Sequence, residues 1–329
     1  MRRVAINGFG RIGRAVFKVL REAEDTKVVA INDLIPADNL AYLLRFDTVY
    51  GRYHRTVEHE GNELVVDGER VPVLSVKDPV DLPWKQMEVD AVVESTGIFT
   101  TRDDLMKHVK AGAKRAILSA PAKSEDVPTV VHGVNAGNDA QLVSCASCTT
   151  NCITPVVEVM NRRIGVEKAM LTTVHSYTSS QGIVDSPSKK MRRGRAGAAN
   201  QVPTSTGAAV ATTKALPELA DRFDGVAIRV PTPVGSIADI VFVTARETSV
   251  DELSAIFTEE AENDRYNGIL GVSTDELVSS DIVGDPRASI VDLAMTRVVD
   301  GTLVKIMAWY DNEWGYANQL ARELCTIPG

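Results

Sequence analysis

Three cysteines lie close together in the segment SCASCTTNC, at Cys145, Cys148 and Cys152. A metal or iron–sulfur site would need a fourth ligand, usually from a second C-x-x-C pair, and the one other cysteine in the sequence is Cys325. Free cysteines are also common as small buried apolar residues. Cys148, however, stands where a predicted strand ends and an apolar helix begins, and a helix N-terminus lowers the pKa of a thiol. Position alone leaves a nucleophile and a structural cysteine evenly balanced.

A histidine base would favour the nucleophile. His54 and His59 lie in polar, loop-like segments, His108 lies on a predicted helix with charged neighbours, and His132 lies inside an apolar strand as a possible core residue. His175 follows the strand Met170–Val174 and is the one best placed to enter a cleft at a strand end. A Cys–His pair beside a dinucleotide is typical of an aldehyde dehydrogenase that works through a thioester.

The segment Gly8-Phe9-Gly10-Arg11-Ile12-Gly13 follows one predicted strand and opens a helix. This G-x-G-x-x-G context binds a pyrophosphate, because the glycines allow a tight turn and the helix N-terminus offers N–H groups. Asp33 follows Gly13 by twenty residues, at the end of the second strand. A carboxylate there accepts hydrogen bonds from the adenine ribose and repels a 2′-phosphate, so NAD is favoured over NADP.

Two patterns of elements must position these residues. In the first half, short apolar runs alternate with helical patterns, which predicts a parallel sheet with helices on both faces. The predicted strands there are Arg3–Asn7, Lys27–Asp33, Val89–Gly97, Lys114–Ala120, Thr129–Val134 and Leu142–Ala146, and the helices are Ile12–Glu24 and Arg102–Ala111.

In the second half, longer consecutive strands predict a mostly antiparallel sheet covered by helices on one face. The predicted strands are Lys168–Tyr177, Gly225–Pro231, Ile237–Arg246, Ser289–Val298 and Val304–Tyr310, and the helices are Thr149–Arg163, Ala208–Leu216, Val250–Glu262 and Glu313–Leu324. The segment Ser176–Pro203, between the first of these strands and the helix Ala208–Leu216, is a long polar, basic loop. Loops of this length are usually functional or interface elements.

Composition limits the classes of protein. The 329 residues suggest about two domains, and 44% hydrophobic with 24% charged residues is ordinary globular usage. No apolar run reaches the ~18 residues of a membrane span, no signal peptide is visible at the N-terminus, and four cysteines do not make a disulfide scaffold. We therefore expect a cytoplasmic protein. The net charge of −8 argues against nucleic acid as a partner, so the basic run at 189–195 is interpreted as a solvated or interface loop.

Several motifs, in order along nearly the whole chain, resemble the phosphorylating glyceraldehyde-3-phosphate dehydrogenase family. They are NGFGRIGR at Asn7–Arg14, ESTG at Glu94–Gly97, SAPAK at Ser119–Lys123, SCTTNC at Ser147–Cys152, HSYT at His175–Thr178, STGAA at Ser205–Ala209, RVPTP at Arg229–Pro233 and WYDNEWGY at Trp309–Tyr316. SCTTNC with its distant histidine is very specific, so the resemblance is not to a generic Rossmann domain.

The resemblance implies a role for each matching position. Cys148 corresponds to the nucleophile and His175 to the base that activates it and later serves as acid–base for the aldehyde oxygen. Cofactor contacts are implied at Gly8, Gly10, Arg11, Ile12, Gly13, Asp33, Lys77, Ser95, Thr96, Ser119 and Asn312. Binding of the substrate phosphate and of inorganic phosphate is implied at Ser147, Cys148, Thr149, Thr178, Arg195, Thr206, Gly207 and Arg229.

The family also implies a fold, an assembly and a reaction. The fold is an α/β Rossmann dinucleotide-binding domain over 1–148 and an α+β catalytic domain with a mostly antiparallel sheet over 149–312. A C-terminal helix, 313–329, packs back on the first domain, and the assembly is a homotetramer. The reaction is the NAD-dependent phosphorylating oxidation of glyceraldehyde 3-phosphate to 1,3-bisphosphoglycerate, a step of glycolysis and gluconeogenesis, through a hemithioacetal and a thioester on Cys148.

The sequence departs from the family at three places. Lys77 replaces the usual arginine near the adenine, Ser179–Gly182 differs after HSYT, and Ser186 resembles a serine of NADP-using relatives, which leaves dual use of NADP as an alternative. Two further alternatives are a dehydrogenase of a related sugar phosphate, such as erythrose 4-phosphate, and a non-catalytic redox-sensing member. The intact Cys148 and His175 argue against the last.

Overall fold

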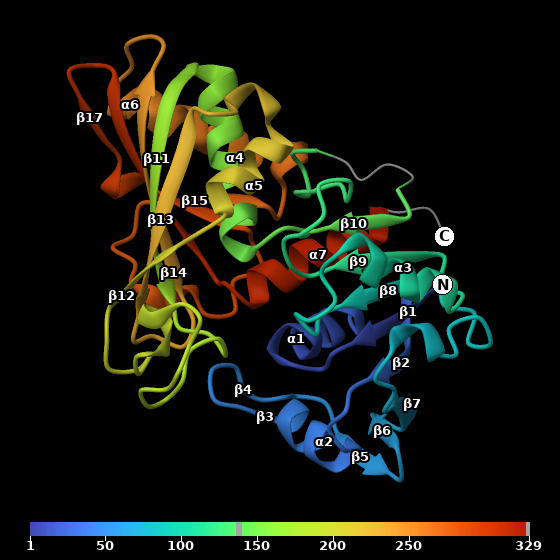
Figure 1. Cartoon of the computed structure of the whole chain (residues 1–329). Coiled ribbons are helices and arrows are strands. Elements are labelled where there is room, and N and C mark those ends of the chain that lie inside the picture. The colour runs from blue at the N-terminus through green and yellow to red at the C-terminus, as the bar shows by residue number, and fades with distance from the viewer. Residues whose placement is uncertain (136–139, 327–329) are drawn as a thin grey trace. The chain divides into compact units, whose positions relative to one another are not determined.

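The computed structural model describes residues 1–135 and 140–326 (Figure 1). The described chain forms two compact units. Unit 1 comprises Met1–Val130, 140–146 and 320–326, and unit 2 comprises Val131–Asn135 and Ser147–Gln319. Within the described ranges no helix is both long and apolar enough to cross a membrane.

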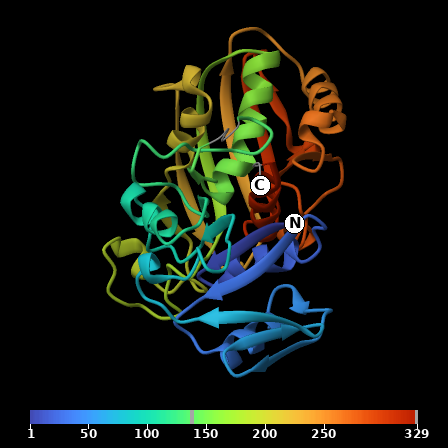
Figure 2. The same ribbon diagram turned by 90° about the vertical axis from the view of Figure 1, so that its right-hand side faces the viewer.

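Unit 1 is built on an eight-stranded sheet in the order β10-β9-β8-β1-β2-β7-β6-β5. From β10 to β7 neighbouring strands are parallel, and β7, β6 and β5 then form an antiparallel edge (Figure 2). The strands are β1 (Arg2–Asn7), β2 (Thr26–Asn32), β5 (Val57–Glu60), β6 (Glu63–Val66), β7 (Glu69–Leu74), β8 (Ala91–Glu94), β9 (Arg115–Leu118) and β10 (Leu142–Ser144), with a separate pair β3 (Phe46–Asp47) and β4 (Gly51–Arg52).

Among the described residues, three α-helices lie wholly within this unit: α1 (Arg11–Leu20), α2 (Ala37–Arg45) and α3 (Arg102–Lys110). α1 begins at the glycine turn and buries Val16, Phe17 and Leu20 on one face. α3 begins with a capping box, in which Thr101 and Asp104 satisfy each other's backbone N–H groups. These contacts fix where each helix starts.

Unit 2 is built on a second sheet in the order β12-β13-β11-β14-β18-β16-β15, with β17 paired to β18. Its pairs are antiparallel except β11 with β13 and β15 with β16. The strands are β11 (Val166–Ser176), β12 (Val202–Ser205), β13 (Phe223–Val230), β14 (Ser236–Thr244), β15 (Leu270–Ser273), β16 (Ser289–Asp292), β17 (Arg297–Val299) and β18 (Leu303–Tyr310). The two sheets confirm the predicted fold class.

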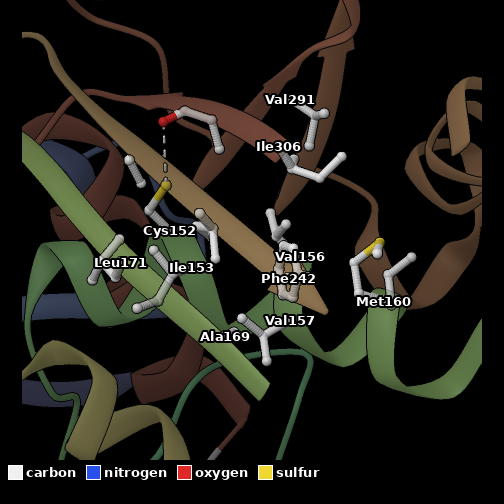
Figure 3. Close-up of a cluster of buried hydrophobic side chains, with 14 of the residues drawn as sticks. Cys152, Ile153, Val156, Val157, Met160, Ala169, Leu171, Phe242, Val291 and Ile306 are labelled. Atoms are coloured by element: carbon white, nitrogen blue, oxygen red, sulfur yellow. Dashed lines mark hydrogen bonds between the residues drawn. The ribbon is translucent and has the colours of Figure 1, made fainter. Parts of the chain in front are cut away.

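Helices cover one face of this second sheet: α4 (Cys148–Arg163), α5 (Ala208–Ala215) and α6 (Val250–Glu262). α4 packs Ile153, Val156 and Val157 against the strands, where they meet Leu171 and Phe242 in a continuous apolar core (Figure 3). α7 (Trp314–Thr326) ends the described chain, so residues 327–329 of the predicted C-terminal helix lie outside the described residues.

Several sequence predictions are corrected. Thr129–Val134 is no strand: Thr129 makes one isolated bridge with Ser144, and the segment is otherwise turn, so His132 lies in a turn. The predicted strand Ser289–Val298 is broken by the 3-10 turn Leu293–Met295, which Asp292 caps.

Two single residues are also placed differently from the prediction. His59 lies in strand β5 rather than in a loop. Cys325 lies within α7 rather than after it, and its carbonyl accepts a hydrogen bond from Arg2.

Candidate active site

Cys148 is the first residue of α4. Ser147 is the N-cap, and its hydroxyl oxygen accepts the backbone N–H of Thr150 at 3.1 Å. Ala146, just before the cap, has φ +55°, a left-handed conformation that costs a non-glycine residue roughly 1 kcal/mol. The strained turn and the cap together place the Cys148 side chain at the positive end of the helix.

His175 is brought to Cys148 by the alternation of β11. Leu171, Thr173 and His175 are buried on the same side of the strand, and the Sγ of Cys148 lies 3.3 Å from Nε2 of His175. In the parallel pairing of β11 with β13, His175 lies opposite Arg229. Neighbouring residues in register share one face of a sheet, so the register places a guanidinium beside the imidazole.

The shortest contact of His175, to the Ser176 carbonyl, favours the tautomer with its hydrogen on Nδ1. Its Nδ1 lies 2.7 Å from the carbonyl oxygen of Ser176, and Nη1 of Arg229 lies 2.8 Å from that oxygen and 2.9 Å from Nδ1. With the hydrogen on Nδ1, both groups donate to the same carbonyl, and Nε2 remains an acceptor facing the thiol.

Burial dominates the electrostatics of this pair. It raises the pKa of the Cys148 thiol, and Arg229, together with hydrogen bonds from Thr149, lowers it only in part. Burial and then the charge of Arg229 lower the pKa of His175 to about 3. The expectation that the helix N-terminus leaves the thiol with a lowered pKa is therefore corrected. Both shifts favour the uncharged forms of the pair, a thiol beside a neutral imidazole.

Three hydroxyl groups, those of Thr149, Tyr310 and Thr173, form a hydrogen-bonded chain between α4 and β11. The Tyr310 hydroxyl is 2.9 Å from Oγ1 of Thr149 and 2.8 Å from Oγ1 of Thr173, and the Tyr310 ring packs edge-on against His175. Tyr310 is 1% exposed. This contact holds the first turn of α4 and the imidazole at fixed positions relative to each other.

Unit 2 also contains arginine side chains that could bind an anion near the Cys148–His175 pair. Nε of Arg229 is buried without a hydrogen-bond partner among the described residues, which leaves a donor for a bound anion. The charge of Arg193 contributes to the lowered pKa of both His175 and Arg229. Arg195, in contrast, is exposed and donates from Nε to Asp185 at 2.7 Å. Arg193 therefore joins the predicted Arg195 as a candidate loop cation for an anion near the histidine.

The remaining predicted residues of unit 2 lie at loop and helix ends. Thr178 follows β11, and its hydroxyl is 2.8 Å from that of Ser180. Thr206 accepts the N–H of Ala208 at 3.2 Å, and Gly207 is the N-cap of α5. These three positions are not linked to Cys148 by a direct contact that the structure defines.

Asn312 follows β18 and is oriented by a buried serine. The hydroxyl of Ser236 accepts the N–H of Ser176 at 3.1 Å and donates to Oδ1 of Asn312 at 2.9 Å. The amide nitrogen of Asn312 therefore points away from Ser236 and is available as a donor.

The glycine turn of unit 1 fits a pyrophosphate. A Cβ at Gly8, whose φ is +91°, would lie 2.6 Å from the backbone nitrogen of Thr96, and a Cβ at Gly13 would lie 2.1 Å from the carbonyl of Gly8. Gly10 has open space where its Cβ would be, at the N-terminus of α1. The first and third glycines thus allow close packing, and the second leaves room for a phosphate over the helix N-terminus.

The other cofactor candidates of unit 1 follow the carboxyl ends of the parallel strands, where α/β sheets bind ligands. Asp33 follows β2 and accepts the N–H of Phe9 at 2.7 Å, which ties it to the glycine turn. Arg11 and Ile12 begin α1, and Arg11 pairs with Asp47 at 2.7 Å. The rest are Ser95 and Thr96 after β8, Ser119 after β9, and the exposed Lys77 after β7.

Comparison with known proteins decides the family. Residues 2–102 match the model described as glyceraldehyde 3-phosphate dehydrogenase, NAD binding domain, and residues 147–312 match the C-terminal domain of the same enzyme. The chain belongs to the glyceraldehyde-3-phosphate dehydrogenase family. This confirms the family predicted from the motifs and NAD as the cofactor of the first domain.

Relatives match over almost their whole length. Glyceraldehyde-3-phosphate dehydrogenase 2 of Streptomyces avermitilis is 48% identical over 323 residues, which are 97% of this chain and 96% of the relative. Glyceraldehyde-3-phosphate dehydrogenase of Thermotoga maritima is 48% identical over 329 residues, 98% of each chain. Glyceraldehyde-3-phosphate dehydrogenase of Geobacillus stearothermophilus is 47% identical over 322 residues, which are 97% of this chain and 96% of the relative.

Sequence reasoning missed four residues at this site: Thr173, Arg193, Ser236 and Tyr310. Thr173 could have been found, because it alternates with His175 on a predicted strand. Tyr310 lies in the quoted WYDNEWGY motif, but its contact with Thr149 joins residues 161 positions apart. Arg193 and Ser236 carry no local signal.

Proposed function

We propose that this chain catalyses the NAD-dependent phosphorylating oxidation of glyceraldehyde 3-phosphate to 1,3-bisphosphoglycerate. The single observation that supports the roles most strongly is the 3.3 Å contact between Sγ of Cys148 and Nε2 of His175, with Arg229 beside the imidazole. Cys148 is the nucleophile, and His175 is the base and later the acid. The enzyme family supports the proposed reaction, and this contact supports the proposed roles of the two residues.

The first step is attack by the thiol. His175 Nε2 takes the proton of Cys148, and the sulfur bonds to the aldehyde carbon while the carbonyl oxygen receives a proton from the imidazolium. The product is a hemithioacetal on Cys148. Because Nδ1 stays bonded to the Ser176 carbonyl, the imidazole keeps its orientation while the proton moves.

Oxidation needs the hydroxyl proton to leave. His175 Nε2 takes this proton back as the hemithioacetal becomes a thioester, and NAD, when bound, accepts the hydrogen and electron pair of the former aldehyde carbon. A thioester retains the acyl-transfer potential that a carboxylate would lose. An oxygen of inorganic phosphate then bonds to the acyl carbon, the C–S bond breaks, and Cys148 recovers its proton through His175.

Two anions must be held near one sulfur during this sequence. Arg229, with its unpartnered buried Nε, and Arg193 supply charge. Hydroxyls and amides of Ser147, Thr149, Thr178, Thr206 and Gly207 complete the two phosphate sites in our proposal. Arg195 remains a candidate loop cation beside Arg193 in this proposal.

Residues of unit 1 hold the pyrophosphate and the adenosine part of the dinucleotide in this proposal. Gly8, Gly10 and Gly13 allow close approach of the pyrophosphate, with Arg11 and Ile12 at the start of α1, and Asp33 binds the ribose. Lys77, Ser95, Thr96 and Ser119 contact the rest of the cofactor, and the oriented amide of Asn312 binds the nicotinamide carboxamide.

We further propose the predicted domains, 1–148 and 149–312, with the described C-terminal helix α7 (Trp314–Thr326) belonging to the first, a cytoplasmic location, and a homotetramer. The tetramer is supported by the face of the unit 2 sheet opposite its helices, where Met170, Val226 and Leu303 are 57%, 51% and 43% exposed. Exposed apolar side chains on a sheet face favour association with a second copy.

One spectrophotometric experiment tests the function. Formation of the reduced cofactor is followed at 340 nm with glyceraldehyde 3-phosphate and either NAD or NADP, each with and without phosphate. We expect sustained turnover with NAD and phosphate and one turnover per site without phosphate. Absence of any NAD reduction would refute the proposal, and faster turnover of erythrose 4-phosphate would reassign the substrate.

A further inference from the structure

Glu94, the last residue of β8, is a fully buried carboxylate that the proposed mechanism does not use. Its Oε1 accepts the backbone N–H and the hydroxyl of Thr96, at 2.9 and 2.5 Å. Its Oε2 accepts Nδ2 of Asn7 at 2.5 Å and lies 3.1 Å from Nε2 of His108. Four donors thus fill the roughly four acceptor positions of the carboxylate.

His108 can only donate to Glu94 from Nε2, because a second hydrogen-bond partner fixes the tautomer of its ring. Nε1 of Trp84 is a donor only and lies 3.1 Å from Nδ1 of His108. Nδ1 must therefore accept, and Nε2 must carry the hydrogen that points to Glu94.

Asn7 is fixed in the same way. Its Oδ1 accepts Nδ2 of Asn32 at 2.7 Å. Asn32 is oriented in turn by the backbone of Val76, which donates to its Oδ1 at 2.9 Å and accepts from its Nδ2 at 3.0 Å. Turning the Asn7 amide over would bring two NH₂ groups face to face, so the amide nitrogen of Asn7 stays directed at Glu94.

This network supports the glycine turn directly. A Cβ at Gly8 would lie 2.6 Å from the nitrogen of Thr96, so the turn packs on the backbone that Glu94 holds. The hydroxyl of Ser95 also donates to the carbonyl of Gly8 at 2.6 Å. A displacement of Thr96 would therefore be transmitted to Gly8.

We propose that Glu94 is the positioning residue of the cofactor cradle: its carboxylate fixes Thr96 and Asn7, and through them the turn at Gly8 that receives the pyrophosphate. Glu94 has no exposed surface and touches no ligand itself. The inference rests on binding of NAD by unit 1 and adds a residue on which the affinity depends.

Glu94→Gln is the test, since it keeps the size and replaces one oxygen by an NH₂ group. In one orientation that group faces the donors of Asn7 and His108, which are fixed and cannot accept it. In the other it faces the Thr96 hydroxyl, which can accept it, and the Thr96 backbone N–H, which cannot. We expect the Kd for NAD, measured by titration calorimetry without substrate, to rise about tenfold or more, because buried donors lose their acceptor. The KM for NAD should rise in parallel, while kcat at saturating NAD and the KM for glyceraldehyde 3-phosphate stay within about twofold.

Glu260→Gln is the matched control. Glu260 is also a buried carboxylate, 3% exposed and bonded to Arg162 and Arg163, but it lies in unit 2 on α6. Its replacement should lower the melting temperature and leave the Kd for NAD unchanged. If Glu94→Gln does not fold, His108→Leu is the second test of the inference. It removes one of the four hydrogen-bond donors that contact the Glu94 carboxylate, and it should raise the Kd for NAD about threefold.

Wild-type affinity for NAD in a folded Glu94→Gln protein, or in His108→Leu if that variant decides, would overturn this inference alone. An equal loss of NAD affinity in Glu260→Gln would also overturn it, because the effect would then be general destabilisation. A wild-type protein that binds no NAD would overturn the proposed function and this inference with it.

Discussion

Replacing His175 by asparagine removes the base and leaves its surroundings in place. The Ser176 carbonyl keeps its hydrogen bond from Arg229 at 2.8 Å, so the strand end and the guanidinium remain fixed. The shorter amide cannot take a proton from Sγ of Cys148, which lies 3.3 Å from Nε2 in the native protein. We therefore expect the variant to fold and to lose the proton transfer selectively.

The size of the loss follows from general acid–base catalysis, which contributes roughly 100- to 10,000-fold. That range corresponds to about 3–5 kcal/mol in the activation free energy. The assay is a stopped-flow single turnover with glyceraldehyde 3-phosphate and NAD in the absence of phosphate, so that only formation of the thioester is observed. Steady-state turnover with phosphate should fall as much or more.

A burst rate within about threefold of the wild type would refute the reasoning. His108 is no evident substitute, because it is fully buried between Trp84 and Glu94 in unit 1.

Arg229→Gln separates the electrostatic role of the guanidinium from the role of His175 as base. Because Arg229 lowers the pKa of both Cys148 and His175, its loss should shift the pH profile of thiol alkylation to higher pH, and an unchanged profile would contradict this electrostatic account.

Three further predictions concern labelling, cofactor choice and stability. A limiting dose of iodoacetamide should label Cys148 first, in step with loss of activity. Cys145 and Cys152 are 3% and 0% exposed, and of the two half-buried cysteines Cys148 has the base His175 at its sulfur whereas Cys325 lies beside Asp25; Cys152→Ala should stay active. Asp33→Asn, which keeps one oxygen for a backbone N–H but removes the charge, should narrow the preference for NAD over NADP in kcat/KM by about tenfold, and an unchanged ratio would direct attention to Ser186. Glu260→Gln should lower the free energy of unfolding by about 1–3 kcal/mol at pH 7. Hydrogen bonds from Arg162 and Arg163 lower the pKa of Glu260, so this difference is present above its unfolded pKa of about 4.3 and disappears as the pH falls through the lower folded value. A difference that grows in acid would contradict the assignment.

The sequence predicted those parts of the fold whose signals are local. The glycine turn with α1 and the helix after Cys148 each depend on neighbouring residues, and both are observed within a few residues of the predicted bounds. The polar edge strand β5, with the sequence VEHE, was missed because charged residues at the rim of a sheet look like a loop.

The site could be predicted only where family motifs or strand ends indicated it. The contact of Tyr310 with Thr149 and Thr173 depends on the sheet order β11-β14-β18, which no local pattern contains. A basic run without periodicity does not show which of its side chains faces the histidine. Within that run, the charge of Arg193 is the one that contributes to the lowered pKa of His175. The pKa of Cys148 was misjudged because the sequence shows the helix N-terminus but not the burial of the sulfur.

The central claim is that Cys148 forms the acyl-enzyme. Mixing the protein with glyceraldehyde 3-phosphate and NAD without phosphate, followed by acid quench and peptide mass spectrometry, tests it most directly. The account predicts a 3-phosphoglyceroyl adduct on the peptide that contains Cys148, released by hydroxylamine and absent from Cys148→Ser. An adduct on Cys152, or a full burst of reduced cofactor in Cys148→Ser, would contradict the account.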